Sequence, residues 1–179
     1  MKKLLSISVL ALSTFAMTVQ AAPATLSANG VKLVKNGEGT RSVFGMKVYR
    51  GALYLKSKSN NAVAIVKADE PMAIHLDVTS SLITKDKMKK VVYEGFAKST
   101  GSKTAMRPQV DKLLNVFGSG IKKGDKFTLV YTPGKGVVAS KNGKAGSVVP
   151  GVKFKQALFG VWIGAKPAQS SLKKAMLGQ

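Results

Sequence analysis

The order of two hydrophobic patterns most restricts how this 179-residue chain can fold. Apolar residues alternate with other residues over 72–78 and again over 126–132, which is typical of strands with one buried face. Between them, residues 84–99 and 109–117 carry apolar side chains at helical spacing. Because strands and helices do not alternate one by one, a doubly wound parallel sheet is disfavoured. We expect one α+β domain with a largely antiparallel sheet.

The N-terminal half adds further strands and a short helix. Residues 29–56 carry apolar and β-branched side chains that predict strands, and residues 36–39 (Asn-Gly-Glu-Gly) predict a turn between them. Asn60 and Asn61 offer an N-cap to a helix over residues 62–68. This half therefore predicts strands, one helix and then the alternating strand at 72–78.

The C-terminal half predicts a hairpin followed by two helices. Asn142-Gly143 suits a type I′ turn, so residues 137–140 and 144–148 are expected to pair. Residues 154–162 place apolar side chains at helical spacing, which predicts a helix with one apolar face. A last helix is expected over residues 170–177.

The first 21 residues have the pattern of a signal peptide. A cationic start, Met1-Lys2-Lys3, precedes an apolar run over residues 4–19, and Val19-Gln20-Ala21 suits a signal peptidase. A transmembrane anchor is the alternative, but the run is shorter than the roughly 20 apolar residues that a span needs. We expect a signal peptide over 1–21 and a domain over 22–179. The signal-peptide pattern predicts export, to the periplasm of a Gram-negative source. No later segment is long and apolar enough for a transmembrane span.

Composition excludes several kinds of chemistry. The chain has no cysteine and one histidine, so disulfides, thiol catalysis and metal sites built from several such residues are excluded. His75 is expected to be exposed on the polar face of its strand. Asp77 shares that face, but the pair supplies neither a nucleophile nor a metal site. We therefore expect no metal and no cofactor.

Lysine dominates the charge, with 26 of the 29 basic residues against 8 acidic ones. Removing residues 1–21 leaves 27 basic residues against the same 8 acidic ones, a net charge of +19. The lysines are spread along the chain, which favours a solvated surface, with electrostatic contact to an anionic envelope surface as the alternative. No recognition motif is present, so a specific nucleic-acid partner is not expected.

Arg41 differs from this lysine background. It follows Gly37-x-Gly39 and enters a segment that also carries Tyr49. A planar guanidinium is the preferred partner of a buried carboxylate or a delocalised oxyanion, so Arg41 indicates an anion site. The alternative is an ion pair with Glu38 at the end of a hairpin.

Several segments, taken in order, resemble the chalcone isomerase superfamily, most closely its exported bacterial chalcone isomerase-like proteins. The similar segments are residues 37–41, 47–55, 92–96, 121–125, 131–136, 142–144, 157–164 and 171–173. The resemblance implies an open-faced β-sandwich, in which a large, mostly antiparallel sheet is covered by a layer of helices. It also implies a cleft between the two layers.

The resemblance implies site residues as well. Arg41 matches the family arginine, which guides the phenoxide in the isomerases, whereas fatty-acid-binding members use arginine and tyrosine on the carboxylate. Tyr49 falls where the isomerases carry threonine. Residues 85–91 lack their tyrosine and asparagine, and Val161 replaces their last serine or threonine.

These residues imply a non-catalytic protein with no catalytic residues. It would bind a small lipophilic anion such as a fatty acid, with Arg41 and Tyr49 as ligand-binding residues. The alternative is an isomerase, an intramolecular lyase acting on a chalcone-like or other small phenolic substrate. We expect the protein to be a monomer.

Overall fold

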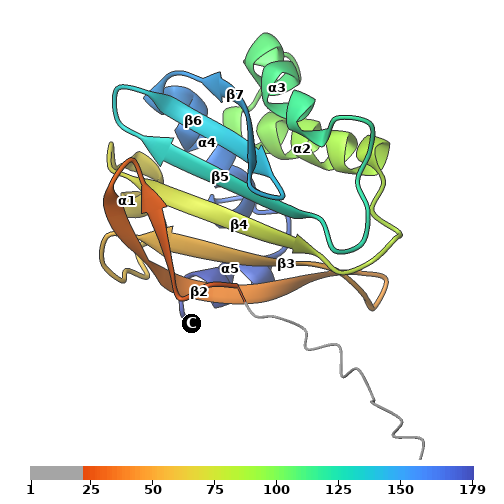
Figure 1. Cartoon of the computed structure of the whole chain (residues 1–179), viewed down its shortest axis with the longest axis horizontal. Coiled ribbons are helices and arrows are strands. Elements are labelled where there is room, and N and C mark those ends of the chain that lie inside the picture. The colour runs from red at the N-terminus through yellow and green to blue at the C-terminus, as the bar shows by residue number, and fades with distance from the viewer. Residues whose placement is uncertain (1–21) are drawn as a thin grey trace, which may run out of the picture.

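One curled antiparallel sheet carries the rest of the molecule (Figure 1). The computed structural model describes residues 22–179, and the expected signal peptide, residues 1–21, lies outside the described residues. The strands follow one another in chain order, so each pairs with its sequence neighbours. They are β1 (Thr25–Ala28), β2 (Val31–Val43), β3 (Met46–Leu55), β4 (Met72–Val78), β5 (Lys126–Thr132), β6 (Gly136–Lys141) and β7 (Lys144–Val149).

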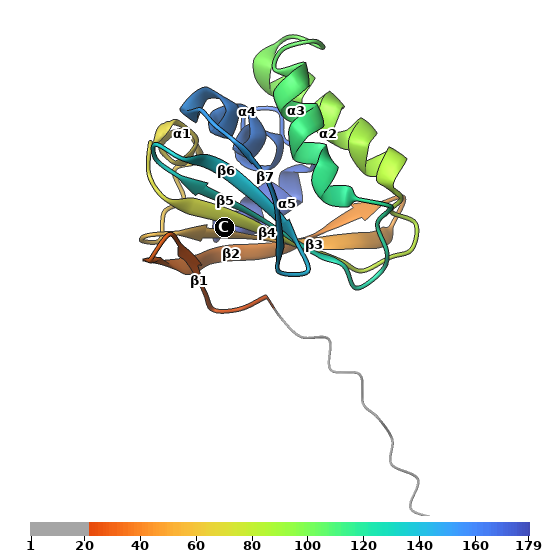
Figure 2. The same cartoon turned by 45° about the horizontal axis from the view of Figure 1, so that its top comes forward.

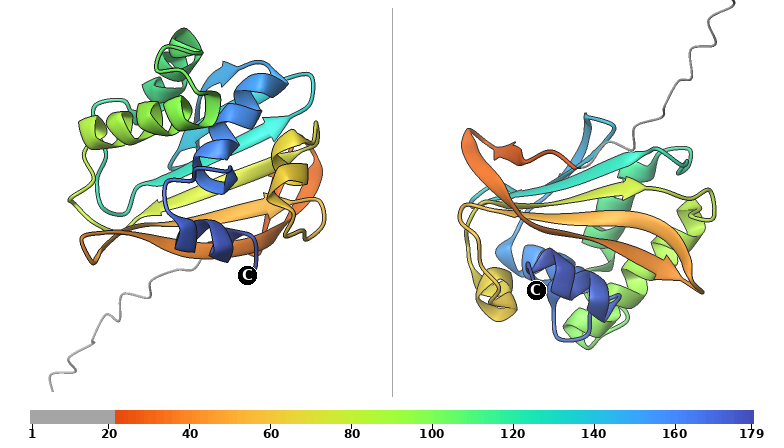
Figure 3. Two further views of the ribbon diagram at one scale, coloured as in Figure 1. Left: turned by 180° about the vertical axis from the view of Figure 1, so that it is seen from behind. Right: turned by 90° about the horizontal axis from the view of Figure 1, so that it is seen from below.

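The helices cover one face of this sheet (Figure 3). They are α1 (Ala62–Lys67), α2 (Lys85–Thr100), α3 (Arg107–Leu114), a short 3₁₀ turn η1 (Asn115–Phe117), α4 (Val152–Ile163) and α5 (Ser170–Met176). The predicted α+β architecture, a mostly antiparallel sheet with a layer of helices, is confirmed. The strand β1 was not predicted.

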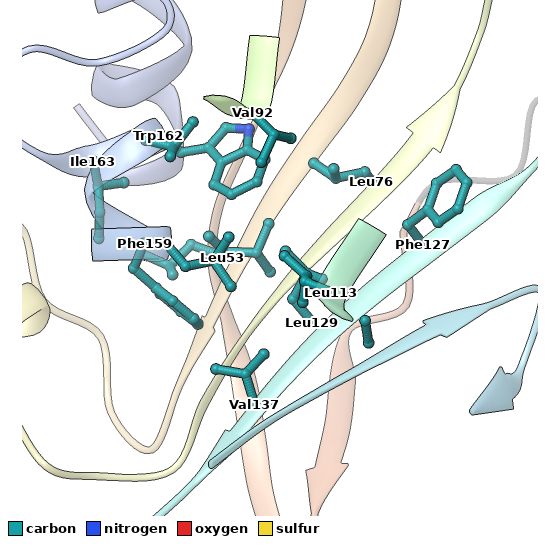
Figure 4. Close-up of a cluster of buried hydrophobic side chains, with 14 of the residues drawn as sticks. Leu53, Leu76, Val92, Leu113, Phe127, Leu129, Val137, Phe159, Trp162 and Ile163 are labelled. Carbon is teal, nitrogen blue, oxygen red and sulfur yellow. The ribbon is translucent and has the colours of Figure 1, made fainter. Parts of the chain in front are cut away.

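The main core lies between the sheet and the helices, and α4 is at its centre. Trp162, Phe159 and Ile163 of α4 face Leu53 and Leu129 of the sheet (Figure 4). The prediction that this helix has one apolar face is wrong. Its side chains are buried nearly all round, because α1, α2 and α5 also pack against it.

The turn predicted at residues 36–39 is also wrong, because β2 continues through it. The pairing of β2 with β3 shifts between Lys35 and Gly37, which marks a bulge at Asn36. The Asn36 side chain donates to the carbonyls of Ser59 and Met176, both at 2.9 Å. It also accepts from the Ser59 backbone amide at 2.8 Å. The Asn36 side chain thus forms hydrogen bonds within a continuous strand, and no turn is present here.

The glycines that follow Asn36 allow α5 to pack directly on β2. A Cβ atom at Gly37 would lie 2.1 Å from the Ala175 carbonyl oxygen, and one at Gly39 would lie 2.6 Å from the Ala175 Cβ. The Gly-x-Gly pattern therefore serves close packing of a helix on a strand. Arg41 is the next residue on the same face of β2, because side chains alternate along a strand.

The outer face of the sheet is partly covered by β1, on the side away from α2 and α3 (Figure 2). His75 is on this outer face and is only 7% exposed, so its predicted exposure is wrong. Its ring nitrogens lie 2.9 Å from the Thr128 hydroxyl and 3.2 Å from an Asp77 oxygen. Arg50 also pairs with Asp77, at 3.2 Å. These polar partners allow the histidine to be buried.

The predicted Asn142-Gly143 hairpin is confirmed. Both residues are left-handed, with φ of 51° and 81°, as a type I′ turn requires. Within residues 22–179, no helix is both long enough and apolar enough to cross a membrane.

Candidate functional site

A cleft opens between the far end of the β2–β3 hairpin and the N-terminal half of α2. Its volume is about 620 Å³. The hairpin end and α2 lie at the same side of the molecule in both views of Figure 3. Strand residues therefore form one wall of the cleft, and α2 with the segment before it forms the other.

Apolar side chains make up most of the lining. They are Val43, Phe44, Met46, Val48, Leu82, Ile83 and Val91. Val48 and Ile83 are buried, whereas Phe44, Met46 and Leu82 are exposed at the mouth. The interior of the cleft thus offers apolar contact, and its mouth presents apolar side chains to solvent.

The remaining lining residues are charged, and three of the four are cationic. Arg41 comes from β2, whereas Lys87, Lys90 and Glu94 come from α2. Lys87, Lys90 and Glu94 are exposed, and Arg41 is half-buried at the strand. The net positive charge of this lining favours an anion.

A second irregularity in the β2–β3 pairing shapes the cleft at Arg41. Arg41 pairs with Tyr49, but Ser42 pairs with Lys47, so Val48 is an extra residue on β3. Such a bulge redirects side chains, and here both Val48 and Tyr49 are buried. The Ser42 amide donates instead to the side chain of Gln169, at 3.0 Å.

Arg41 has no carboxylate partner among residues 22–179. Its Nε atom is buried and makes no hydrogen bond within that part of the chain. The alternative pairing with Glu38 is wrong. Glu38 lies three residues away, on the opposite face of β2, and it pairs with Lys35 at 3.0 Å and Arg50 at 3.8 Å.

Tyr49 lies beside Arg41 but does not line the cleft. The Arg41 Cζ atom is 5.8 Å from the centroid of the Tyr49 ring. The Tyr49 hydroxyl accepts a hydrogen bond from Trp162 Nε1 at 3.0 Å. Burial raises the pKa of Tyr49, and the Arg41 charge opposes that rise. The two predicted site residues are therefore adjacent, with Arg41 at the cleft and Tyr49 in the core beside it.

Helix α2 is held over the cleft by its cap and by close packing on α4. The Thr84 hydroxyl caps its first turn by accepting from the Lys87 amide at 3.3 Å. Gly95 meets Val161 of α4, where an added Cβ would lie 2.6 Å from a Val161 methyl carbon. The position of α2 is thus fixed by packing that leaves no room for a side chain at residue 95.

The sequence model of the chalcone isomerase-like family matches residues 16–178. This chain belongs to the chalcone isomerase-like family. A comparison with curated proteins finds no match.

Among solved structures, the chain is similar to a fatty-acid-binding protein of Arabidopsis thaliana. The TM-score is 0.69 at 14% sequence identity, over 87% of this chain and 90% of that chain. At this identity the likeness shows that the two chains share a fold.

The positions that differ from the isomerases of the family are now placed. Residues 85–91 lack the tyrosine and asparagine of the family isomerases. This segment contributes Lys87, Lys90 and Val91 to the lining of the cleft. Val161 is 1% exposed and packs against Gly95, so it does not reach the cleft. Within residues 22–179, no group of three histidine, cysteine, aspartate or glutamate side chains could hold a metal ion.

The lysines of α2 and the apolar mouth were not predicted as site residues from the sequence. Lys87 and Lys90 are three residues apart on a predicted helix and so share a face, which was the available signal. Phe44 and Met46 of the β2–β3 hairpin line the cleft together with Leu82 of the β4–α2 connection, and these two segments come close only in the folded protein. No local sequence pattern indicates that these two segments lie close together.

Proposed function

We propose that this protein binds a lipophilic anion such as a fatty acid in the cleft, with Arg41 as the anchor for the carboxylate and without catalysing a reaction. The observation that carries the proposal is the state of Arg41. This guanidinium is half-buried beside apolar side chains, and no carboxylate within residues 22–179 pairs with it. A desolvated cation without a counter-charge is costly, so an anionic ligand would relieve that cost.

The cleft has the size and lining that such a ligand requires. Its volume of about 620 Å³ falls in the range typical of small-molecule sites. An alkyl chain along Val48, Ile83 and Val91 would gain about 25 cal/mol for each Å² of apolar surface removed from water. Lys87 and Lys90 would add long-range attraction for the carboxylate, whereas the planar fork of Arg41 would orient it.

Tyr49 would act on the ligand through Arg41. Its ring lies beside the guanidinium, and its hydroxyl is already engaged by Trp162. We therefore assign Tyr49 a positioning role that fixes the direction of the Arg41 side chain. The bond from Trp162 leaves the Tyr49 O–H free to donate, but Tyr49 does not line the cleft, so a direct contact with the carboxylate would require its side chain to move.

The fold relationship supports a binding function. The similar Arabidopsis protein is named for binding fatty acids. An isomerase needs groups that stabilise the transition state more than the substrate, but residues 85–91 lack the tyrosine and asparagine of the family isomerases and Val161 replaces their last serine or threonine. We further propose that the protein acts after export, in the periplasm of a Gram-negative source.

Calorimetric titration of delipidated protein with dodecanoate tests the anchor. Arg41→Ala should weaken binding at least tenfold, a difference of about 1.4 kcal/mol. Arg41→Lys should recover only part of the affinity, because an ammonium lacks the bidentate fork. Lys135→Ala, at an exposed turn residue between β5 and β6, is the control and should bind as the wild type does.

Two results would contradict the proposal. Equal affinities for the wild type and Arg41→Ala would remove the anchor, and no binding of any amphiphile would remove the function. Incubation with a hydroxychalcone tests the catalytic alternative: we expect cyclisation at the spontaneous rate, without enantiomeric preference. Rapid formation of one flavanone enantiomer would show that the protein is an isomerase.

A further inference from the structure

The tip of the β2–β3 hairpin presents an unusual residue to solvent. Phe44 is 95% exposed, although it belongs to the turn of a structured hairpin. Val43 pairs with Met46, so Phe44 and Gly45 form a two-residue turn. Both are left-handed, with φ of 49° and 76°. A bulky side chain rarely adopts this conformation, because its Cβ approaches the following carbonyl.

Two other hairpins of the same chain provide an internal comparison. Asn29-Gly30 joins β1 to β2 with φ of 50° and 84°, and Asn142-Gly143 joins β6 to β7 with φ of 51° and 81°. Asparagine tolerates the left-handed region, so those two turns are locally favourable. At the third turn, phenylalanine replaces asparagine, although its ring makes almost no contact within the fold. Local stability does not explain Phe44, which indicates a contact outside the protein.

The surroundings of Phe44 are both apolar and cationic. Residues 22–179 contain five exposed large hydrophobic side chains, and three of them, Phe44, Met46 and Leu82, lie at the mouth of the cleft. Lys47 is exposed next to the tip, and Lys87 and Lys90 are exposed on the facing helix. Glu94 in the cleft and the exposed Asp86 of α2 are the acidic groups on that helix. Cations therefore outnumber acids around an apolar tip.

We propose that the β2–β3 hairpin inserts Phe44 into the interface of an anionic lipid bilayer, with Met46 and Leu82 beside it and Lys47, Lys87 and Lys90 on the lipid headgroups. An aromatic side chain is favoured at the level of the headgroups, and lysines there are attracted by anionic lipids. The strongly basic composition of the chain adds long-range attraction. Docking in this orientation turns the mouth of the cleft toward the bilayer.

This orientation also indicates the route of the ligand, an extension that rests on the proposed function. A lipophilic acid dissolved in the bilayer would reach Arg41 by way of Phe44 and Met46 without crossing bulk water. Docking itself requires no ligand, so it can be measured on delipidated protein alone.

Sedimentation with vesicles tests the docking. The probes are phosphatidylcholine vesicles with and without phosphatidylglycerol, and no fatty acid is added. The wild type should bind the anionic vesicles and lose this binding as salt is raised. Phe44→Asn should bind them about tenfold more weakly, whereas its Tm should equal or exceed that of the wild type, because asparagine suits the turn. Val63→Gln, which removes an apolar side chain 63% exposed on α1, is the matched control and should bind as the wild type does.

A fluorescent variant reports insertion directly. Phe44→Trp places an indole at the tip, whereas the native Trp162 is buried in the core at 4% exposure. Brominated anionic lipids should quench Phe44→Trp and leave the wild-type emission unchanged. Equal quenching of both proteins, or of neither, would overturn the insertion of the tip.

Other outcomes overturn the proposal without touching the function of the cleft. They are vesicle binding by Phe44→Asn equal to that of the wild type, equal wild-type binding to neutral and anionic vesicles, and a Phe44-dependent dimer in light scattering. Wild-type calorimetry with dodecanoate remains a separate measurement. If dodecanoate binds and vesicles do not, only the docking fails; if vesicles bind through Phe44 and dodecanoate does not, only the proposed function fails.

Discussion

Lys155 is a basic residue that the fold takes out of water entirely. It lies on α4 with no exposed surface. Its ammonium donates to the carbonyls of Val66, at 2.8 Å, and Ala68, which end α1. The Tyr131 ring centroid is 5.3 Å from the Lys155 Nζ atom. Burial lowers the pKa of Lys155 from 10.5 to about 8, although the charge of Asp69 opposes this effect.

This lowered pKa predicts a pH dependence of stability. Between about pH 8 and 10.5 the unfolded chain holds the Lys155 proton more tightly than the folded protein does. The free energy of unfolding therefore gains a contribution that increases with pH over this window. Lys155→Met removes this contribution, so the wild type should gain stability relative to Lys155→Met as pH rises from 7 to 10 in urea unfolding experiments.

The exposed Lys153, on the same helix, provides the control. Lys153→Met should show the same pH dependence as the wild type. If the stability difference between the wild type and Lys155→Met were independent of pH, the lowered pKa would be wrong.

The sequence does not distinguish Lys155 from the other lysines. Residues 154–162 predict a helix with one apolar face, and such a helix places its lysine in water. Lys155 is buried because the C-terminal end of α1 packs against α4 at this residue. The local hydrophobic periodicity of residues 154–162 does not indicate this contact. The same reason explains the error at His75, because Thr128 of the neighbouring strand lies beside it only in the assembled sheet.

At the scale of elements, the contact between β2 and α5 depends on the absence of a side chain at Gly37. Gly37→Ala would push a methyl group against the Ala175 carbonyl, because the two atoms would be 2.1 Å apart. We expect a loss of about 1–3 kcal/mol in the free energy of unfolding, the usual cost of overpacking. Chemical unfolding of the variant measures this loss.

Gly120→Ala is the matched control for that experiment. An added Cβ at Gly120 has no neighbour within 4 Å, and its φ is not left-handed. We expect its stability to stay within about 0.5 kcal/mol of the wild type. A Gly37→Ala variant as stable as Gly120→Ala would contradict direct packing of α5 on β2.

The elements that the sequence predicted well have strong local signals. Thr84 caps α2, Asn61 caps α1 and Asn142-Gly143 turns the last hairpin, as side-chain chemistry requires. The failure at residues 36–39 has a physical cause. Asparagine and glycine favour turns when nothing else acts on them, but here a bulge and a packed helix use the same residues.

For the whole molecule, the expected signal peptide over residues 1–21 predicts where the mature chain would start. Cleavage after Ala21 should give a protein beginning at Ala22. N-terminal sequencing of protein purified from its native host measures this directly. Full-length chain recovered from the cytosol would contradict export.

The resemblance to the chalcone isomerase superfamily predicted the fold, and it placed Arg41 and Tyr49 side by side. It also indicated residues 85–91 as a site segment, but it did not identify Lys87 and Lys90 or the apolar mouth as parts of the cleft. A cleft between a hairpin end and a helix exists only once the sheet has curled and α2 has docked on α4.

In the proposed function, Arg41 holds the carboxylate of a lipophilic acid. The most direct measurement is carbon-13 NMR of hexadecanoate labelled at its carboxyl carbon, titrated with acid while bound to the protein. In the wild type, the bound carboxylate should stay ionised to a lower pH than it does in water, because the guanidinium favours the charged form. In Arg41→Ala this downward shift of the ligand pKa should disappear. A bound carboxyl group that titrates at the same pH in both proteins would contradict the claim.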